Sequence, residues 1–306
     1  MIIAITGAAG FIGSHLATHL KAEGHTIHGY DNFERGTAKA DFIKNIDLRK
    51  DDINFTGVDA LIHLASKVGG LPYYLDEAAE VFVENTTIDK KVFDSAIAAG
   101  VKRIIYASSS HVYDPSKKII SHESKDVNPE LTYGMAKLFG ERYLGYACQN
   151  KDIRYASLRL IGIYGEGQDI DLDKSSIIPA LCRRAIEYPD TPYRLLTDGN
   201  ETRTYCYIRD ALKAFDLTLN YLEKSGSFPY PLNVGSEQVV TIKGIAEKII
   251  KISHKEILLQ VTDINSMIRG QECSCQSAKS VLGWESNTPF DEGLRNVYKD
   301  IESRLC

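Results

Sequence analysis

Three glycines spaced three residues apart near the start of the chain constrain its fold more than any other feature. They follow a short isoleucine-rich run, residues 2–6, which indicates a buried strand of a parallel sheet. Residues 15–22 then carry apolar side chains at helical spacing, and Gly24 ends this pattern. The order strand, glycine turn, helix is the context that gives the glycine pattern meaning. The three glycines are Gly7, Gly10 and Gly13.

This glycine turn predicts a dinucleotide site. Gly7 allows a tight turn, Gly10 lets the backbone approach a pyrophosphate, and Gly13 lets helix and strand pack closely. The next expected strand, 26–30, leads into Asp31, whose carboxylate can accept both hydroxyls of an adenosine ribose and would repel a 2′-phosphate. The sequence therefore favours NAD over NADP as the cofactor. The plain alternative is a glycine turn that binds nothing.

Strands and helices alternate along the first half of the chain, which predicts a Rossmann-type doubly wound parallel sheet, an α/β fold, within residues 1–165. The further strands expected there are 58–66, 102–110 and 153–163, and the long helices are 77–99 and 131–149. Beyond Tyr164 the pattern changes. We expect residues 166–306 to form mainly a smaller C-terminal substrate-binding lobe, with segments near 202–250 returning to the first domain. Its expected helices are 177–188, 205–224, 242–253 and 291–304.

Composition excludes several classes of function. The net charge is −5 and the chain has no basic stripe, so we expect no nucleic-acid partner. No apolar run approaches the roughly 18 residues of a membrane span. The first expected strand begins at residue 2, so we expect no leader. Six scattered cysteines lack zinc-site spacing, so we expect no metal and reduced thiols in a cytoplasmic protein.

The strongest chemical signal is Tyr133 followed by Lys137, four residues later on an expected helix. At this spacing both side chains lie on one face, one turn apart. An ammonium beside a phenol favours the phenolate, so we expect Lys137 to lower the pKa of Tyr133 and make it a general base for a sugar hydroxyl. Lys137 can also hold the nicotinamide ribose. Taken alone, such a pair is more often two surface neighbours.

Three serines, Ser108, Ser109 and Ser110, close the strand expected just before this helix, and His111 follows them. A hydroxyl at this place can share a short hydrogen bond with the reacting oxygen. Serines after a strand are also common turn or cap residues, so they carry weight only together with the Tyr133 helix.

With these motifs the chain resembles the extended short-chain dehydrogenase/reductase family, in particular its nucleotide-sugar epimerases and dehydratases. The resemblance covers almost the whole chain. Beyond the motifs above it rests on Ile46-Asp47-Leu48, His63-Leu64-Ala65, Val112-Tyr113, Asn233-Val234-Gly235, Arg269-Gly270 and Leu282-Gly283-Trp284.

The resemblance implies a role for each matching residue. Ser109 is the catalytic serine, with Ser108 and Ser110 as near misses, and Tyr133 and Lys137 are the other catalytic residues. Ser110, Arg203 and Arg269 fall on the substrate side, where the arginines would grip a diphosphate; the alternative for either is a surface ion pair. Asn85 would be structural. The implied cofactor-binding residues are Gly7, Gly10, Phe11, Ile12, Gly13, Asp31, Asn32, Asp47, Leu48, Leu64, Ala65 and Lys67, together with Tyr133 and Lys137.

The chain also departs from the family's patterns. The 4,6-dehydratases carry Asp-Glu where this chain has Ser110-His111, which makes water elimination doubtful. The 3,5-epimerases have a cysteine at the position of His111, so this histidine is either an acid/base beside the sugar or a buried, hydrogen-bonded residue. The second acid/base of that branch falls near Ser176. Gly162 stands where many members have an asparagine that touches the substrate phosphates.

These patterns predict an NAD-dependent epimerase of a nucleotide-diphosphate sugar. It would oxidise the sugar at carbon 4 to a ketone and reduce it again. The alternatives are a 4-dehydrogenase that releases the keto sugar and a 3,5-epimerase that uses His111. The rival from another class is a non-catalytic NAD-binding protein, which would need none of Ser109, Tyr133 and Lys137. By resemblance, the helices 77–99 and 131–149 would form a homodimer interface.

Overall fold

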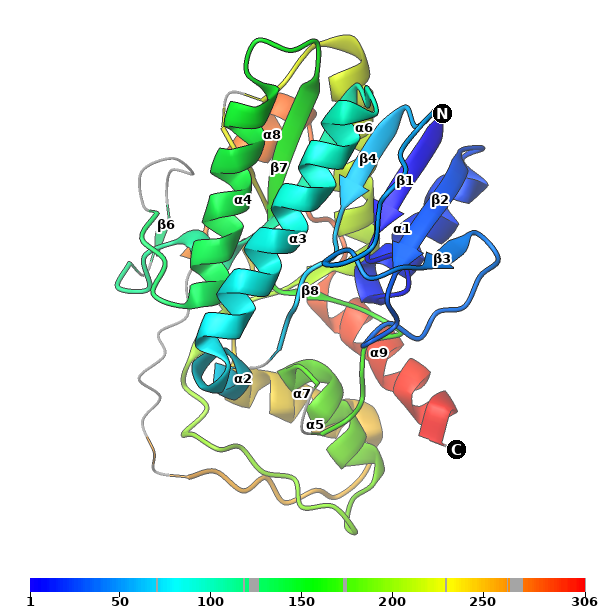
Figure 1. Cartoon of the computed structure of the whole chain (residues 1–306). Helices are drawn as coiled ribbons and strands as arrows, with labels where there is room; N and C mark the ends of the chain where they lie inside the picture. Colours follow the sequence, from blue (N-terminus) through cyan, green and yellow to red (C-terminus); the bar gives the residue numbers. More distant parts are fainter. Residues whose placement is uncertain are drawn as a thin grey trace.

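A parallel sheet forms the centre of the molecule (Figure 1). The computed structural model describes residues 1–69, 71–117, 119–120, 127–172, 175–228, 230–262, 264 and 272–305. Among these residues, seven strands are hydrogen-bonded in the order β11-β7-β5-β4-β1-β2-β3, and each pairing is parallel. The strands are β1 Ile2–Thr6, β2 Thr26–Asp31, β3 Ile43–Asn45, β4 Ala60–His63, β5 Arg103–Ser109, β7 Arg154–Leu160 and β11 Leu232–Val234.

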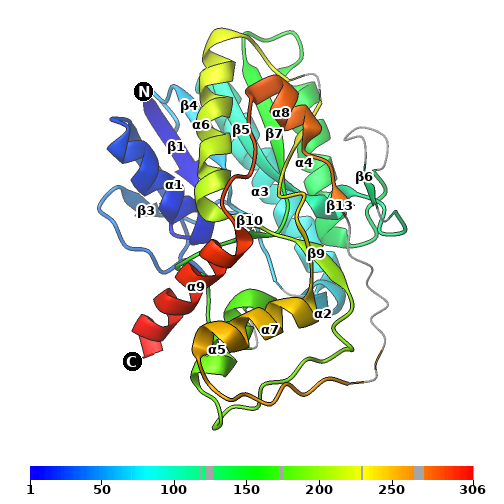
Figure 2. The same ribbon diagram turned by 180° about the vertical axis from the view of Figure 1, so that it is seen from behind.

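Helices cover both faces of this sheet because successive strand residues point to opposite faces and both sets are apolar. In β1, Ile3 and Ile5 enter one buried cluster and Ala4 enters another. Figure 1 shows α3 (Ala78–Ala98) and α4 (Thr132–Cys148) on the near face, and Figure 2 shows α1 (Phe11–Ala22), α6 (Ile208–Lys224) and α8 (Gln276–Leu282) on the other. The predicted Rossmann-type doubly wound sheet is therefore confirmed.

A second group of helices lies beyond the carboxyl ends of the strands (Figure 2). It consists of α5 (Ile177–Ile186), α7 (Ile242–Ser253) and α9 (Phe290–Leu305), which pack around a buried cluster of their own. Short strand pairs lie outside the main sheet. They are β8 (Ile163–Tyr164) with β10 (Cys206–Tyr207), β9 (Thr202–Thr204) with β12 (Val239–Thr241), and β6 (Ile119–Ile120) with β13 (Glu272–Cys273).

Element boundaries differ from the sequence-based ones where tertiary pairing intervenes. The helix expected from residue 205 begins at Ile208, because Cys206 and Tyr207 pair with β8. The first helix begins at Phe11, so Gly13 lies inside it. A short helix, α2 (Leu71–Asp76), and α8 were not expected. In the described part of the chain, no helix combines the length and apolar character needed to cross a bilayer.

Candidate active site

The glycine turn after β1 has a conformation that other residues would not tolerate. Gly7 adopts a φ of +71°, and its N–H donates to the carbonyl of Tyr30 over 2.8 Å. Gly13 packs so closely on the turn that a Cβ there would collide with the Gly7 carbonyl. The turn therefore brings β1 and α1 together at the carboxyl edge of the sheet.

This turn fits the phosphates and ribose of a dinucleotide. Gly10, at the N-terminus of α1, offers no capping side chain, so the first N–H groups of the helix are available to an anion. A Cβ on Gly10 would meet nothing nearer than the Gly7 carbonyl at 3.3 Å, which leaves this face open. Asp31, 8% exposed, accepts from the N–H groups of Ala9 at 2.9 Å and Phe33 at 2.8 Å, and its carboxylate lies beside the turn.

Other residues expected at the cofactor are held by ion pairs. Arg49 donates to both carboxylate oxygens of Asp47 over 2.8 Å, and this contact lowers the pKa of Asp47 to about 2. Glu84 lies 3.0 Å from both Arg49 and Lys67, and burial of Lys67 opposes the rise in its pKa that Glu80 and Glu84 cause. These contacts tie the region after β3 and the loop after β4 to α3.

The end of β4 reaches the same edge of the sheet. Leu64 N–H donates to the carbonyl of Thr6 over 3.2 Å, and Ala65 N–H donates to the Thr6 hydroxyl over 3.3 Å. Asn85 on α3 holds the next residues: its Oδ1 accepts from Ser66 Oγ and from Lys67 N–H, each over 2.7 Å. The remaining expected cofactor residues lie nearby: Phe11 and Ile12 in the first turn of α1, Asn32 after β2, and Leu48 buried after β3.

Tyr133 and Lys137 lie on the buried face of α4, at 8% and 2% exposure. The expectation that Lys137 lowers the pKa of Tyr133 is wrong for this structure. Lys137 Nζ donates to the carbonyl of Ala107 over 2.9 Å and lies 5.9 Å from the centre of the Tyr133 ring. Burial instead raises the pKa of Tyr133, and hydrogen bonds with Ser109 and Ser66 oppose that rise.

Ser109, at the end of β5, faces Tyr133, whereas Ser108 does not. Ser109 Oγ lies 3.0 Å from His111 Nδ1 and hydrogen-bonds with Tyr133. Ser108 points to the opposite face, where it donates to Glu141 over 2.5 Å, because side chains alternate along a strand. Ser110 begins the short 3₁₀ turn Ser110–Val112 that carries His111.

His111 lies among aromatic rings and near an arginine. Its ring is 5.5 Å from that of Tyr133, edge to face, while the residue as a whole stays partly open to solvent. The surrounding protein desolvates it, and together with the positive charge of Arg203 this lowers the pKa of His111. The imidazole is therefore predominantly neutral at pH 7. Arg203 on β9 thus lies close enough to the site to act on His111, while Arg269 lies outside the described residues.

Sequence reasoning missed two residues beside Tyr133. Tyr74 of α2 stacks on it, with ring centres 4.8 Å apart and planes inclined by 13°. Ser66 hydrogen-bonds with Tyr133. The only signal for Tyr74 was a pair of tyrosines after a glycine-bearing loop, which does not predict a ring stack.

Gly162 has a backbone reason to be glycine. Its φ is +56°, and a Cβ at this position would collide with the carbonyl of Thr204. An asparagine cannot occupy this place without moving β9. The missing asparagine is therefore explained by the close approach of the segment that carries Arg203.

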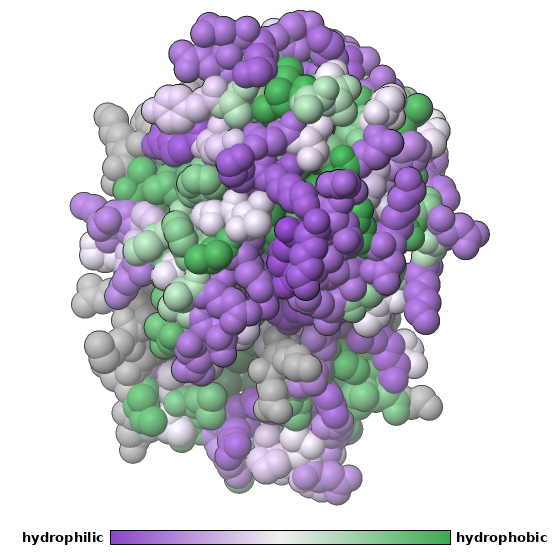
Figure 3. Space-filling model, viewed as in Figure 1, coloured by the Kyte–Doolittle hydropathy of each residue, from purple (hydrophilic) through white to green (hydrophobic). Residues whose placement is uncertain are grey.

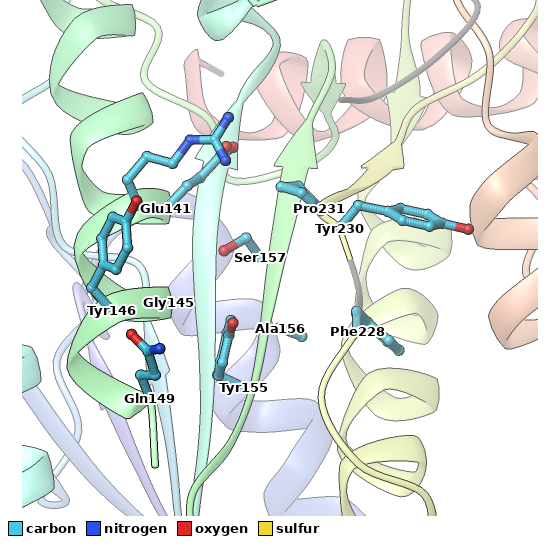
Figure 4. A pocket seen from close by; sticks show the side chains of 11 residues that line it. Glu141, Gly145, Tyr146, Gln149, Tyr155, Ala156, Ser157, Phe228, Tyr230 and Pro231 are labelled. Atoms are coloured by element: carbon cyan, nitrogen blue, oxygen red, sulfur yellow. The ribbon is translucent and has the colours of Figure 1, made fainter. Parts of the chain in front are cut away.

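A cavity of ≈ 450 Å³ lies away from Tyr133, between α4, β7 and the segment before β11 (Figure 4). Tyr146 and Gln149 on α4 border it, with Tyr155 on β7 and Tyr230 on the facing segment. Glu141, which binds Ser108, also lines it. Its lining shares no residue with the cluster of Ser109, Tyr133 and Lys137.

Residues 3–235 match the sequence model of a family described as "NAD dependent epimerase/dehydratase family". NAD is the cofactor of that family, and the glycine turn and Asp31 fit it. The cofactor prediction is therefore confirmed.

Individual relatives differ in their reactions. The chain is 29% identical to GDP-mannose 3,5-epimerase 1 of Oryza sativa subsp. japonica, over 99% of this chain and 82% of that protein. It is 27% identical to a putative UDP-glucose 4-epimerase of Methanocaldococcus jannaschii, over 97% of each chain. The structure is similar to that of MoeE5 in complex with UDP-glucose and NAD, with a TM-score of 0.86, 25% identity and complete coverage of both chains.

Proposed function

Because the chain belongs to the NAD dependent epimerase/dehydratase family, we propose that it epimerises a nucleotide-diphosphate sugar through a ketone at sugar carbon 4. The observation that carries this proposal is the grouping of Ser109, Tyr133 and Lys137 at the carboxyl edge of the sheet, beside the glycine turn. Ligands of open α/β sheets bind at this edge. A protein that only binds NAD needs none of these three side chains.

The residues divide the work as follows. Tyr133 takes the proton of the carbon-4 hydroxyl and gives it back when the ketone is reduced. Ser109 hydrogen-bonds with Tyr133 and holds the reacting oxygen within reach, and Lys137 would hold the nicotinamide ribose. When bound, NAD would supply the redox chemistry, namely the removal and return of a hydride at carbon 4. The two transfers cancel, so the product is an isomer of the substrate.

Burial opposes ionisation of Tyr133, so the chain must offset that cost. The hydroxyls of Ser109 and Ser66 both lower the pKa of Tyr133. The positive ring of oxidised NAD would act in the same direction. We infer that Arg203, whose charge lowers the pKa of His111, binds the diphosphate of the substrate.

Epimerisation at carbons 3 and 5 is the second candidate, and His111 is the observation that favours it. A neutral imidazole 3.0 Å from Ser109 is a suitable base for a proton next to a ketone. The rice relative is named for this reaction. Ser176, which falls where that branch has its second acid/base, is the N-cap of α5 and its hydroxyl accepts from Gln168 over 3.3 Å. A serine hydroxyl does not titrate near neutrality, so Ser176 is not suited to be the second acid/base of a 3,5-epimerase.

Solvent deuterium separates the candidate reactions. We would incubate a panel of nucleotide sugars with the enzyme in D₂O, return the products to H₂O so that only carbon-bound deuterium remains, and measure product masses. For the 4-epimerase, we expect an isomer without added deuterium, because the hydride returns from the cofactor. A gain of one or two mass units per molecule would instead indicate the 3,5-epimerase. A loss of two hydrogens with accumulation of NADH would indicate a 4-dehydrogenase, and a loss of water a 4,6-dehydratase.

Two variants test whether the protein is an enzyme at all. Tyr133→Phe and Lys137→Ala should each lower turnover by about 10²–10⁴-fold, the range for a lost acid/base group. Tyr133→Phe should keep its NAD. Unchanged turnover in both variants would mean that the measured activity does not arise from Tyr133 and Lys137, as the non-catalytic rival requires.

We also propose that the protein is a homodimer through α3 and α4. These helices lie against each other and expose apolar side chains to solvent, namely Phe82, Val83, Met135 and Tyr146. Figure 3, drawn from the same side, shows apolar and polar residues interleaved over this face. Light scattering measures the mass directly, and charged substitutions at Val83 and Met135 should give monomers.

Two broader proposals follow the same reasoning. We assign NAD to residues 1–165, with the returning segments near 202–250, and the sugar mainly to residues 166–306. Among the described residues, Cys148, Cys182 and Cys206 are buried free thiols, and we infer that the protein works in the reducing cytoplasm. Limited proteolysis with and without nucleotide sugar would test the division.

A further inference from the structure

A chain of buried polar side chains runs beneath Lys137. Thr6 Oγ1 lies 2.6 Å from His63 Nδ1, and His63 Nε2 lies 3.0 Å from Asp89 Oδ1. Tyr106 donates its hydroxyl to Asp89 Oδ2 over 2.6 Å. All four side chains are 0–1% exposed. Unlike the catalytic cluster, these four hydrogen-bonded side chains have no part in the mechanism above.

The hydrogen bonds determine which atoms of Thr6 and His63 carry the protons in this network. Thr6 Oγ1 accepts from the N–H of Ala65, so its own proton is free to go to His63 Nδ1. His63 then carries its single proton on Nε2 and donates it to Asp89. Burial lowers the pKa of His63, in agreement with this neutral form. Asp89 receives two donors and no compensating positive charge from His63, so it keeps a net negative charge.

The packing of α4 brings this charge close to Lys137. Lys137 Nζ lies 4.8 Å from the centre of the Tyr106 ring, whose hydroxyl binds Asp89. Gly140 follows Lys137 by three residues on the same face of α4, and a Cβ there would collide with both the Tyr106 hydroxyl and Asp89 Oδ2. The glycine therefore makes room for the Tyr106–Asp89 hydrogen bond directly beside Lys137.

We propose that Asp89 is a positioning residue that keeps buried Lys137 charged, with neutral His63 and Tyr106 fixing its carboxylate in place. This proposal rests on the role of Lys137 at the cofactor. A buried ammonium is costly to charge, and the described residues show Lys137 a single hydrogen-bond acceptor, the Ala107 carbonyl. Asp89 on α3 supplies negative charge, and in the described part of the chain Lys137 donates to the Ala107 carbonyl alone, so its other N–H groups stay available to a cofactor.

The charged and titratable groups around Lys137 come from four elements. They are Asp89 on α3, Tyr106 on β5, His63 on β4, and Tyr133 and Glu141 on α4. Burial lowers the pKa of Lys137, and the charges of Asp89 and Glu141 oppose that change. Glu141 is already bound by Arg159 through two hydrogen bonds, which leaves Asp89 as the carboxylate without a cationic partner among the described residues.

The test is the pH dependence of NADH binding, followed by NADH fluorescence. NADH is suitable because its nicotinamide ring is uncharged. Protonated Lys137 therefore does not repel the ring, and its charge can only strengthen NADH binding. The negative charge of Asp89 opposes the lowering of the Lys137 pKa by burial, so Lys137 is protonated below its pKa in the folded protein, and the affinity for NADH is lost as the pH rises through that pKa. We expect Asp89→Asn to move this loss to lower pH by about one unit or more, because removal of the negative charge lowers the pKa of Lys137.

Asp94→Asn is the matched control. It removes the same charge from the same helix, but Asp94 is partly exposed and pairs with Lys90. Asp94→Asn should leave the pH at which NADH affinity is lost unchanged. Tyr106→Phe, which removes a hydroxyl and keeps the charge of Asp89, should also leave it near the wild-type value. If Asp89→Asn does not fold, Asp89→Ser removes the same charge with a smaller side chain.

The Lys137→Met background distinguishes an effect through Lys137 from a general structural one. In that background the pH-dependent loss of NADH affinity should disappear, and adding Asp89→Asn should not produce another pH-dependent loss. The role of Asp89 alone would be overturned if Asp89→Asn left the pH at which NADH affinity is lost unchanged. It would also be overturned if Asp89→Asn shifted that pH by the same amount in the Lys137→Met background. Absence of any loss in the wild type would overturn both this role and the proposed contact of Lys137 with the cofactor.

Discussion

The rings of Tyr74 and Tyr133 are stacked, with centres 4.8 Å apart and planes inclined by only 13°. Tyr74 is 6% exposed and comes from α2, a short helix that no sequence pattern predicted. The stack covers one face of the proposed catalytic phenol and excludes water from it. Burial is the largest cause of the raised pKa of Tyr133, so Tyr74 contributes directly to that rise.

Tyr74→Ala should therefore shift the acid side of the pH–rate profile. Tyr133 acts as a base in its ionised form, and water admitted beside the phenol would lower its pKa. The ionised form would then be present at lower pH, and kcat/KM would begin to rise at lower pH than in the wild type. Tyr74→Phe keeps the stacked ring and should leave the profile in place. An unmoved profile in Tyr74→Ala would contradict this account.

Gly13→Ala should abolish cofactor binding. The added methyl would collide with the carbonyl of Gly7 and force α1 away from the glycine turn. The purified variant should contain no NAD, measured by absorbance after denaturation. Gly145→Ala is the control on α4. Its methyl would meet only the Tyr155 side chain, with the hydroxyl at 3.4 Å, and the gain in helix propensity should raise stability by up to about 1 kcal/mol. NAD retained in Gly13→Ala would show that the turn can open.

Asp31→Asn should weaken NAD binding and reduce the ratio of the affinity for NAD to the affinity for NADP. The variant removes the negative charge that would repel a 2′-phosphate and one acceptor for the ribose hydroxyls. A hydrogen bond to a charged group contributes about 1.5–3 kcal/mol, so we expect the Kd for NAD to rise about 10–100-fold. Calorimetric titration with both cofactors measures this. The interpretation fails if the ratio of the two affinities does not change.

Arg159→Leu should destabilise the protein strongly. Arg159 is 1% exposed and donates to both oxygens of Glu141 over 2.8 Å and 2.7 Å. Its loss leaves a buried carboxylate whose remaining donor is Ser108, at a cost of about 3–5 kcal/mol in the free energy of unfolding. Urea denaturation measures it. Lys102→Ala, which breaks an exposed pair with Asp152, should have no measurable effect, and equal losses would contradict the argument.

Much of the cofactor half could be predicted because its signals are local. Gly7, Gly10 and Gly13 lie within seven residues, and a strand–turn–helix unit positions them without help from distant segments. Alternation along β5 likewise explains why Ser109, rather than Ser108, faces Tyr133, and the family pattern had already selected Ser109.

The electrostatics of the catalytic cluster could not be predicted in the same way. The spacing of Tyr133 and Lys137 is correct for one helix face, but spacing says nothing about what buries them. The stacked ring of Tyr74 and the carbonyl of Ala107 come from other segments, and they reverse the expected direction of the Tyr133 pKa. A pKa depends on all nearby groups, wherever they lie in the chain.

The amino-acid sequence by itself determined the parallel sheet, the glycine turn and the preference for NAD, because hydrophobic period and glycine placement act over a few residues. Tertiary structure alone decided which groups surround Lys137. Asp89, His63 and Tyr106 come from three elements that the sheet and α4 bring together, and Gly140 is the small residue that allows their contact. Burial and charge in a protein interior are properties of assembled elements, so only the folded chain reveals them.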